Sequence, residues 1–155
     1  MQYIIGIGTN LGDKSLNISN ALKLLSQYFK VIRTSNVYKS KALLKADASK
    51  EWDRDFFNLA TLVNSSSKPS QLLKILKLIE TKMGREQDSP RFSPRIIDLD
   101  ILIAENLILG EKKLQIPHKE LLNREFTLIP ASEVAPDFIH PITKKTLKEH
   151  RIMFV

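Results

Sequence analysis

Cysteine is absent from this chain of 155 residues, so disulfides and metal sites built from thiolates are excluded. Long apolar runs are absent as well, because no segment approaches the roughly 18 apolar residues that a membrane-spanning helix needs. The N-terminal stretch MQYIIGIGTNLGD has no positively charged region ahead of its short apolar run, unlike an export signal. These absences predict a cytoplasmic protein without a membrane partner.

The composition is that of a globular protein, with 43% hydrophobic and 26% charged residues. The length fits one ordinary domain, so we expect residues 1–155 to form a single domain. Lysine and arginine (24) outnumber aspartate and glutamate (17), and the net charge of +7 favours an anionic partner such as a nucleotide, a phosphorylated metabolite or a nucleic acid. The charge alone fits a solvated basic surface equally well.

Hydrophobic periodicity predicts a mixed architecture. Strands are expected at residues 2–8, 31–38, 56–64 and 96–104, and helices at 15–29 and 69–83, with a glycine at 84 as C-cap. Residues 39–55 and 85–95 are long polar loops, 114–126 is irregular, and short helices are expected at 125–134 and from about 143. The order strand, helix, strand, strand, helix, strand predicts an α+β, ferredoxin-like split βαβ fold, an antiparallel sheet with helices packed on one face and extra C-terminal elements.

Two aspartates stand two positions apart in the stretch RFSPRIIDLD (91–100). Side chains alternate along a strand, so Asp98 and Asp100 share one face. Paired carboxylates on a half-buried face repel each other and lose hydration, so a cation is needed to balance them. Mg²⁺ is held by one or two carboxylates together with water and substrate phosphates. A solvated strand face, or ion pairs with Arg91 and Arg95, is the alternative for a bare pair of this kind.

Three arginines, Arg85, Arg91 and Arg95, mark the loop ahead of these aspartates. Planar guanidinium groups bind phosphate oxygens through two hydrogen bonds at once. Arginines that bind phosphates, next to carboxylates that bind Mg²⁺, are typical of a nucleotide-dependent phosphoryl transferase. A flexible basic surface would have a similar sequence. Phe92 in the same loop suggests a flap that closes over a flat ligand.

Other polar features carry less information. The glycines of GIGTNLGD (6–13) miss the spacing of a dinucleotide-binding turn, so we expect a tight turn closed by Asn10 and Asp13. The histidine of IPH (116–118) has no second histidine at ligand spacing, which argues against zinc. If Glu80 faces inward, it is placed to orient the arginines of the following loop.

Five stretches occur in order along nearly the whole chain: IGTNLGD (7–13), FFN (56–58), IETKMGR (79–85), RFSPRIIDLDIL (91–102) and IPHKELLNREF (116–126). Together they closely resemble the 6-hydroxymethyl-7,8-dihydropterin pyrophosphokinases of folate biosynthesis. Members of that family have a ferredoxin-like fold and transfer pyrophosphate from ATP to the hydroxymethyl oxygen of the pterin, releasing AMP. The resemblance implies the same activity here, with ATP and the pterin as partners and two Mg²⁺ ions as cofactors.

The resemblance also implies roles for individual residues. Asp98 and Asp100 would bind the two Mg²⁺ ions, with Asp98 near the accepting hydroxyl, and Arg91 and Arg95 would be catalytic arginines of a mobile loop. The ATP-binding residues implied are Glu80, Arg85, Arg91, Arg95, Lys113, His118 and Arg124. The pterin-binding residues implied are Ser40, Leu43, Phe56, Asn58, Phe92, Asp98 and Phe126.

This sequence departs from the family pattern at several loop positions. Gln87 stands where relatives often carry an arginine, Ser93 replaces a glycine, and Lys119 replaces an aromatic residue. The stretch SKA (40–42) replaces a threonine followed by two prolines, and the loop after it is longer. These changes affect loop contacts and leave the aspartates and Arg91 and Arg95 in place.

Two other functions compete with this interpretation. A basic RNA-binding module has a similar order of elements, but FFNLATLVN (56–64) lacks the aromatic and glycine pattern of an RNA-binding strand. The second alternative is a catalytically silent relative of the family. The retained aspartates and arginines argue against it. We therefore predict a monomeric enzyme without a nucleic-acid partner.

Overall fold

The structure is a computed structural model that describes residues 1–42, 44, 46–86 and 88–154. Its strands are β1 (Gln2–Thr9), β2 (Lys30–Thr34), β3 (Tyr38–Ser40), β4 (Phe56–Asn64), β5 (Asp98–Ala104), β6 (Leu109–Glu111) and β7 (Leu114–Ile116). Its helices are α1 (Lys14–Tyr28), α2 (Pro69–Lys82), α3 (Glu125–Val134) and α4 (Leu147–Arg151), with short 3-10 helices η1 (Lys50–Trp52) and η2 (Ile152–Phe154). Within the described ranges, no helix is both long and apolar enough to span a membrane.

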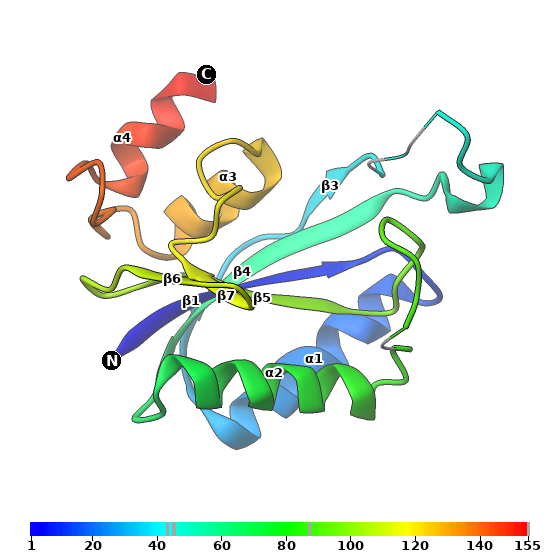
Figure 1. Ribbon diagram of the computed structural model, residues 1–155, viewed down its shortest axis with the longest axis horizontal. Coiled ribbons are helices and arrows are strands. Elements are labelled where there is room, and N and C mark those ends of the chain that lie inside the picture. The colour runs from blue at the N-terminus through cyan, green and yellow to red at the C-terminus, as the bar shows by residue number, and fades with distance from the viewer. Residues whose placement is uncertain (43, 45, 87, 155) are drawn as a thin grey trace.

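A central antiparallel sheet has the strand order β2-β4-β1-β5, and β3 pairs with the start of β4 (Figure 1). Helix α1 connects β1 to β2, and these two strands have β4 between them in the sheet. Helix α2 connects β4 to β5, and these two strands have β1 between them. Each βαβ unit is thus split by a strand of the other unit. This topology confirms the predicted α+β, ferredoxin-like fold.

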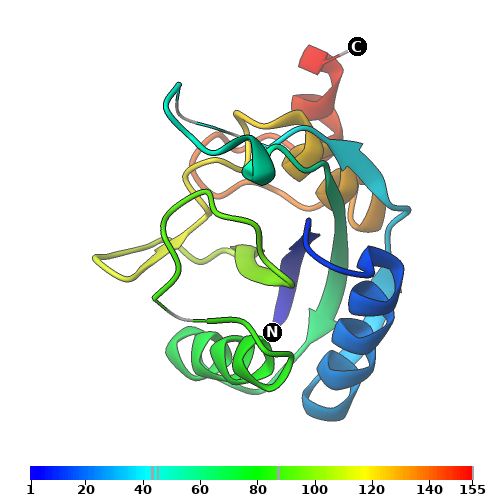
Figure 2. The same cartoon turned by 90° about the vertical axis from the view of Figure 1, so that its right-hand side faces the viewer.

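Helices α1 and α2 lie side by side on one face of the sheet, as Figure 2 shows from the end. Their apolar stripes supply Leu25, Leu76 and Ile79, which are fully buried against the sheet in one continuous core. Both helices lie within a residue of the predicted ranges because their start and stop signals are local: Asp13 accepts a hydrogen bond from the N–H of Leu16 at the N-cap of α1. The backbone of Gly84 has φ 94°, as the predicted left-handed C-cap of α2 requires.

The expectation of helices on one face is incomplete, because α3 and α4 pack on the opposite face (Figure 1). The strands β1, β4 and β5 are apolar on both faces, and Ile4, Leu62 and Leu102 form a second core with residues of α3 and α4, including Leu128 and Leu147. A sheet with two apolar faces needs cover on both. The extra C-terminal elements are that cover.

Three local predictions also differ from the structure. The strand expected at 31–38 is two strands, since β2 ends at Thr34 after a bulge and β3 begins at Tyr38. The segment 114–126 is not wholly irregular, because β7 pairs with β6 in a hairpin. The last helix begins only at Leu147, where the side chain of Thr146 caps it.

Candidate active site

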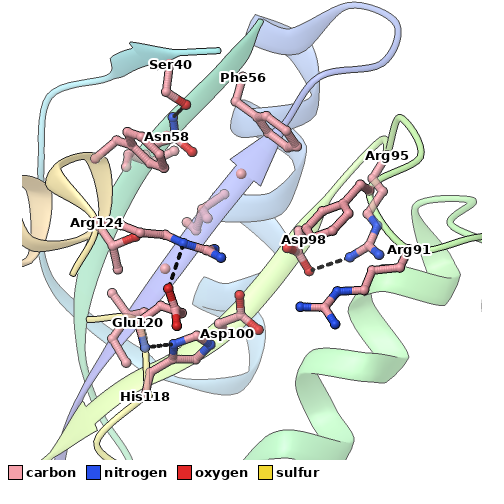
Figure 3. A pocket seen from close by; sticks show the side chains of 18 of the residues that line it. Ser40, Phe56, Asn58, Arg91, Arg95, Asp98, Asp100, His118, Glu120 and Arg124 are labelled. Carbon is pink, nitrogen blue, oxygen red and sulfur yellow. Dashed lines mark hydrogen bonds and ion pairs between the residues drawn. The ribbon is translucent and has the colours of Figure 1, made fainter. Parts of the chain in front are cut away.

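Helix α3 leaves part of the second sheet face uncovered, and a cavity of about 350 Å³ opens there. Figure 3 shows side chains from separate segments pointing toward one another across it. Most of the predicted site residues line this cavity, namely Ser40, Phe56, Asn58, Arg85, Arg91, Phe92, Arg95, Asp98, Asp100, His118, Arg124 and Phe126. The fold thus brings together residues that are far apart in the sequence.

Three predicted site residues are not among those that line the cavity. Glu80 is completely buried behind it. Lys113 lies exposed in the turn between β6 and β7. Leu43 lies outside the described residues, as does Gln87, one of the departures from the family pattern.

The aspartates of β5 stand opposite glycines of β1. In the register of the two strands, Asp98 pairs with Gly8 and Asp100 pairs with Gly6. The glycines lack side chains, and both carboxylates line the cavity beside them. Burial, followed by the charge of Asp98, raises the pKa of Asp100 to about 7. The raised pKa means that a bound cation would relieve the electrostatic repulsion of this pair.

Two arginines surround one oxygen of Asp98. A terminal nitrogen of Arg85 donates to Asp98 Oδ1 at 2.9 Å, and a terminal nitrogen of Arg95 lies 3.6 Å from the same oxygen. Arg91 makes a different contact, because its guanidinium carbon lies 4.8 Å from the ring centroid of Phe92. Arginine charge is therefore concentrated at the Asp98 end of the cavity.

Arg85 is held by Glu80 as well as by Asp98. Glu80 Oε2 accepts from Arg85 Nη1 at 2.6 Å and from the backbone N–H of Leu99 at 2.8 Å, and its Oε1 accepts from Lys77 Nζ at 3.3 Å. A buried carboxylate with three donors is well satisfied. Glu80 therefore ties α2 to β5 and fixes Arg85, as expected for an inward-facing glutamate at this position.

The loop that carries Arg95 is tied to the turn after β1. The backbone N–H of Asn10 donates to the carbonyl of Arg95 at 3.1 Å, and the N–H of Arg95 donates to Asn10 Oδ1 at 2.7 Å. The side-chain amide of Asn10 also lies 3.4 Å from the carbonyl of Arg54. Asn10 was expected to close its own turn, whereas its hydrogen bonds join that turn to the loop of Arg95 and the loop of Arg54.

His118, Glu120 and Arg124 form a second polar group after β7. The backbone N–H of Glu120 donates to His118 Nδ1 at 3.1 Å, and Glu120 Oε2 lies 3.2 Å from Arg124 Nε. Burial and the charge of Arg124 lower the pKa of His118. The imidazole is thus neutral at pH 7, with its proton on Nε2.

The opposite end of the cavity is less charged. Asn58 Nδ2 donates to Ser40 Oγ at 2.7 Å and to the carbonyl of Tyr38 at 3.2 Å. Phe56 and Phe126 line the same cavity. An oriented amide together with aromatic rings suits a flat heterocycle that carries N–H groups.

Sequence reasoning missed Lys77, Lys119 and Glu120 as residues that line the cavity. Lys77 was detectable in principle, because it precedes Glu80 by about one helical turn and so shares its side of α2. Lys119 was noted only as a departure from the family pattern. Glu120 lies in a turn, where periodicity gives no information on direction.

Asp98 and Asp100 fit a magnesium site, although no cluster of three acidic or histidine ligands occurs among the described residues. Mg²⁺ uses one or two carboxylates and fills its remaining positions with water and phosphate oxygens. A cation bound between the two carboxylates would lower the pKa of Asp100, because it favours the charged form. The donor set is therefore suitable for Mg²⁺ and not for zinc.

A ferredoxin-like sheet with paired carboxylates and clustered arginines over one cavity defines a class of phosphoryl-transfer enzymes. The chain belongs to the 7,8-dihydro-6-hydroxymethylpterin-pyrophosphokinase (HPPK) family, whose model matches residues 4–136. The predicted family and the enzyme class, a diphosphotransferase, are thereby confirmed.

Individual relatives agree with this assignment. The 2-amino-4-hydroxy-6-hydroxymethyldihydropteridine pyrophosphokinase of Aquifex aeolicus is 34% identical over 147 residues, which cover 95% of this chain and 88% of that protein. Folic acid synthesis protein FOL1 of Dictyostelium discoideum is 41% identical over 137 residues, 88% of this chain and 20% of that protein. The chain thus spans about a fifth of the length of that relative.

A solved structure shares the fold at low sequence identity. The crystal structure of Plasmodium falciparum HPPK-DHPS wild type with pteroate has a TM-score of 0.76 and 17% identity, and the match covers 99% of this chain and 44% of that chain. The same architecture is therefore kept although most side chains differ.

Proposed function

We propose that this chain transfers pyrophosphate from ATP to the hydroxymethyl oxygen of 6-hydroxymethyl-7,8-dihydropterin and releases AMP, as a step of folate biosynthesis. Membership of the HPPK family supports the reaction class. The observation that carries the proposal is the meeting of Arg85 and Arg95 at one oxygen of Asp98, at 2.9 and 3.6 Å. Two arginines that can bind phosphates thus contact the same carboxylate that can bind a metal ion.

The nucleotide is proposed to lie along the polar side of the cavity. Arg85, Arg91 and Arg95 would bind the phosphates that are transferred, and His118 and Arg124 would bind the rest of ATP. His118 Nδ1 is already an acceptor, so its Nε2–H is the group available to donate to ATP. Glu80 is buried away from the cavity, so we assign it to holding Arg85.

Two Mg²⁺ ions are proposed as cofactors, with Asp98 and Asp100 as the protein ligands. Bound there, Mg²⁺ would neutralise phosphate charge and polarise the phosphorus–oxygen bonds. The chain itself provides fixed arginines, which stabilise the charge that develops on the transferred and leaving phosphates. The loop with Arg91 and Phe92 is proposed to exclude water, which would otherwise hydrolyse ATP.

The pterin is proposed to occupy the end of the cavity near Ser40 and Asn58. Tyr38 presents a carbonyl, which only accepts, so the amide of Asn58 must turn its nitrogen toward it. Its oxygen is then left for the N–H groups of the pterin ring. Phe56 and Phe126 would lie against the ring, and Phe92 would close over it.

The direct test is an assay of AMP release with ATP, Mg²⁺ and the pterin. We expect AMP to form in step with the pterin diphosphate and to be lost in Asp98→Ala. Asp137→Ala removes an exposed aspartate on a distant turn and serves as the control. ADP in place of AMP would show ordinary phosphoryl transfer, and ATP binding without turnover would favour a silent relative.

The same assay tests the arginine assignment. Removing one electrostatic donor typically raises the barrier by about 2 to 4 kcal/mol, so Arg95→Ala should slow AMP release by about thirty- to nine-hundredfold. An unchanged rate would remove Arg95 from the catalytic groups.

We further propose that residues 1–155 act as one pyrophosphokinase domain, as a monomer in the cytoplasm. The residues proposed for the metal, the phosphates and the pterin meet in one cavity of this chain, which supports a site built within a single copy. Light scattering of the purified chain at assay concentration tests the monomer directly.

A further inference from the structure

Glu120 places a negative charge in the cavity where we propose that ATP binds. It belongs to the turn after β7, lines the cavity, and has a side chain that is 30% exposed. Like charges in a partly buried site repel, so a carboxylate here weakens the binding of phosphates unless it serves another group. The contacts of Glu120 identify that group as Arg124.

The ion pair uses one particular nitrogen of Arg124. The contact joins Glu120 Oε2 to Arg124 Nε at 3.2 Å. In Figure 3 the tip of the guanidinium extends past Glu120 into the cavity. A guanidinium held at Nε keeps its four terminal N–H groups for another partner. The pair therefore directs Arg124 and does not block it.

The turn that carries Glu120 is itself fixed to the sheet. The backbone N–H of His118 donates to the carbonyl of Leu102 on β5 at 2.8 Å. The N–H of Arg124 donates to the carbonyl of Glu120 at 3.2 Å, and the N–H of Glu120 donates to the ring of His118. The carboxylate that holds Arg124 therefore has a defined position relative to Asp98 and Asp100.

We propose that Glu120 is a positioning residue that orients Arg124 toward the phosphates of ATP. The proposal rests on the proposed function and adds a residue that acts through Arg124. Free arginine side chains lose about 2 kcal/mol of rotamer entropy when they are fixed, and prior fixation removes part of that loss from the binding step. On the other side of the cavity Glu80 also holds an arginine, although there the carboxylate contacts a terminal nitrogen, Nη1 of Arg85, at 2.6 Å.

Binding of α,β-methylene-ATP with Mg²⁺, measured by calorimetry, tests this without turnover. We expect Glu120→Ala to weaken binding about three- to tenfold, the effect of losing an ion pair in a partly exposed site. Glu120→Gln keeps an acceptor for Nε and should restore part of the affinity. The control is Glu125→Ala, which removes the same charge from the exposed neighbour of Arg124 that does not line the cavity.

A double-mutant cycle separates positioning from other effects. If Glu120 acts through Arg124, Glu120→Ala should have no further effect in the Arg124→Ala background, while the melting temperatures of the single variants stay close to that of the unmodified chain. Equal losses in both backgrounds would overturn the proposal, as would tighter binding by Glu120→Ala.

The outcome is also distinguishable from failure of the proposed function. If the unmodified chain does not bind the analogue, both proposals fall. If the unmodified chain binds it and releases AMP from ATP while Glu120→Ala binds equally well, only the role of Glu120 is wrong.

Discussion

Asn10 and Arg95, 85 positions apart in the sequence, exchange two hydrogen bonds. One joins the backbone N–H of Asn10 to the carbonyl of Arg95, and the other joins the N–H of Arg95 to the side-chain oxygen of Asn10. Because Asn10 is 2% exposed, the pair forms a buried link between the turn after β1 and the arginine loop. The position of a proposed catalytic arginine thus depends on an amide in another loop.

Replacing Asn10 by alanine should therefore reduce catalysis without any change in the arginine itself. The N–H of Arg95 would lose its acceptor in a buried place, which destabilises the fold by about 1 to 3 kcal/mol. We expect the rate of AMP release to fall about tenfold or more, since small displacements of a catalytic group have large effects. Asn17→Ala is the control, because Asn17 braces the same turn through Thr9 and Leu11 without touching Arg95. Equal rates for the two variants would contradict the link.

Glu80 should be essential for stability. Among the described residues, Glu80→Leu would leave the buried guanidinium of Arg85 with Asp98 as its remaining carboxylate partner and would remove the acceptor of the Leu99 N–H. Breaking a buried ion pair from one side typically lowers the free energy of unfolding by about 3 to 5 kcal/mol, and Asp98 should keep the loss near the lower end of that range. Urea denaturation measures this loss. Glu86→Leu, at an exposed position nearby, should have little effect. A stable Glu80→Leu protein would show that the three donors to this carboxylate find other partners.

Gly8 should matter for the pterin and not for the fold. A methyl group at Gly8 would lie 3.6 Å from Asn58 Oδ1 and 3.6 Å from Phe56, which are ordinary contacts. It would nevertheless occupy the floor of the proposed pterin site. We expect Gly8→Ala to raise the KM for the pterin roughly tenfold at an unchanged melting temperature. Gly110→Ala, where a methyl group meets nothing within 4 Å, is the matched control.

The C-terminal region should lose stability in mild acid. His140 is 5% exposed, and its Nδ1 accepts hydrogen bonds from the backbone N–H groups of Ile142 and Thr143, which requires the neutral ring. Burial, followed by the charge of His150, lowers the pKa of His140. The unfolded chain then binds more protons than the folded chain below a pH of about 6.5, so stability falls as the pH drops below that value.

Melting temperatures between pH 5 and 8 measure this effect. His140→Asn keeps a side-chain acceptor without a titrating group, and it should flatten the decline below pH 6.5. An unchanged pH dependence in that variant would assign the decline to other groups. Thr143 contacts both histidines, since its backbone N–H donates to His140 Nδ1 and its hydroxyl lies 2.6 Å from His150 Nε2. The substitution at His140 leaves the contact with His150 in place.

The sequence predicts the main elements of the fold because their signals are local. Continuous apolar runs define β1, β4 and β5, and helical spacing with a proline start and a glycine end defines α2. The break between β2 and β3 is not predictable in this way. It depends on Ser35, whose backbone and hydroxyl bond to Ala60 of β4, a contact that only the assembled sheet provides.

In the candidate site, too, only the features that depend on local sequence signals are predictable. The shared face of Asp98 and Asp100 follows from strand alternation. The direction of Glu80 was left open by the sequence, and the structure shows that it is buried beside Ile79 and Leu76 of the apolar stripe of α2. The link from Asn10 to Arg95 and the direction of Glu120 depend on how loops meet, so no spacing in the sequence predicts them.

The sharing of Asp98 by Arg85 and Arg95 has a thermodynamic consequence. The single charge of the carboxylate is shared by two guanidinium groups before any ligand arrives, so it offsets only part of the repulsion between the arginines. A divalent cation that takes over Asp98 frees both arginines from that carboxylate, while Glu80 still holds Arg85 in place. A polyanion that engages the arginines in turn frees Asp98. The affinities for cation and polyanion must therefore rise together, by the same factor in either order of addition.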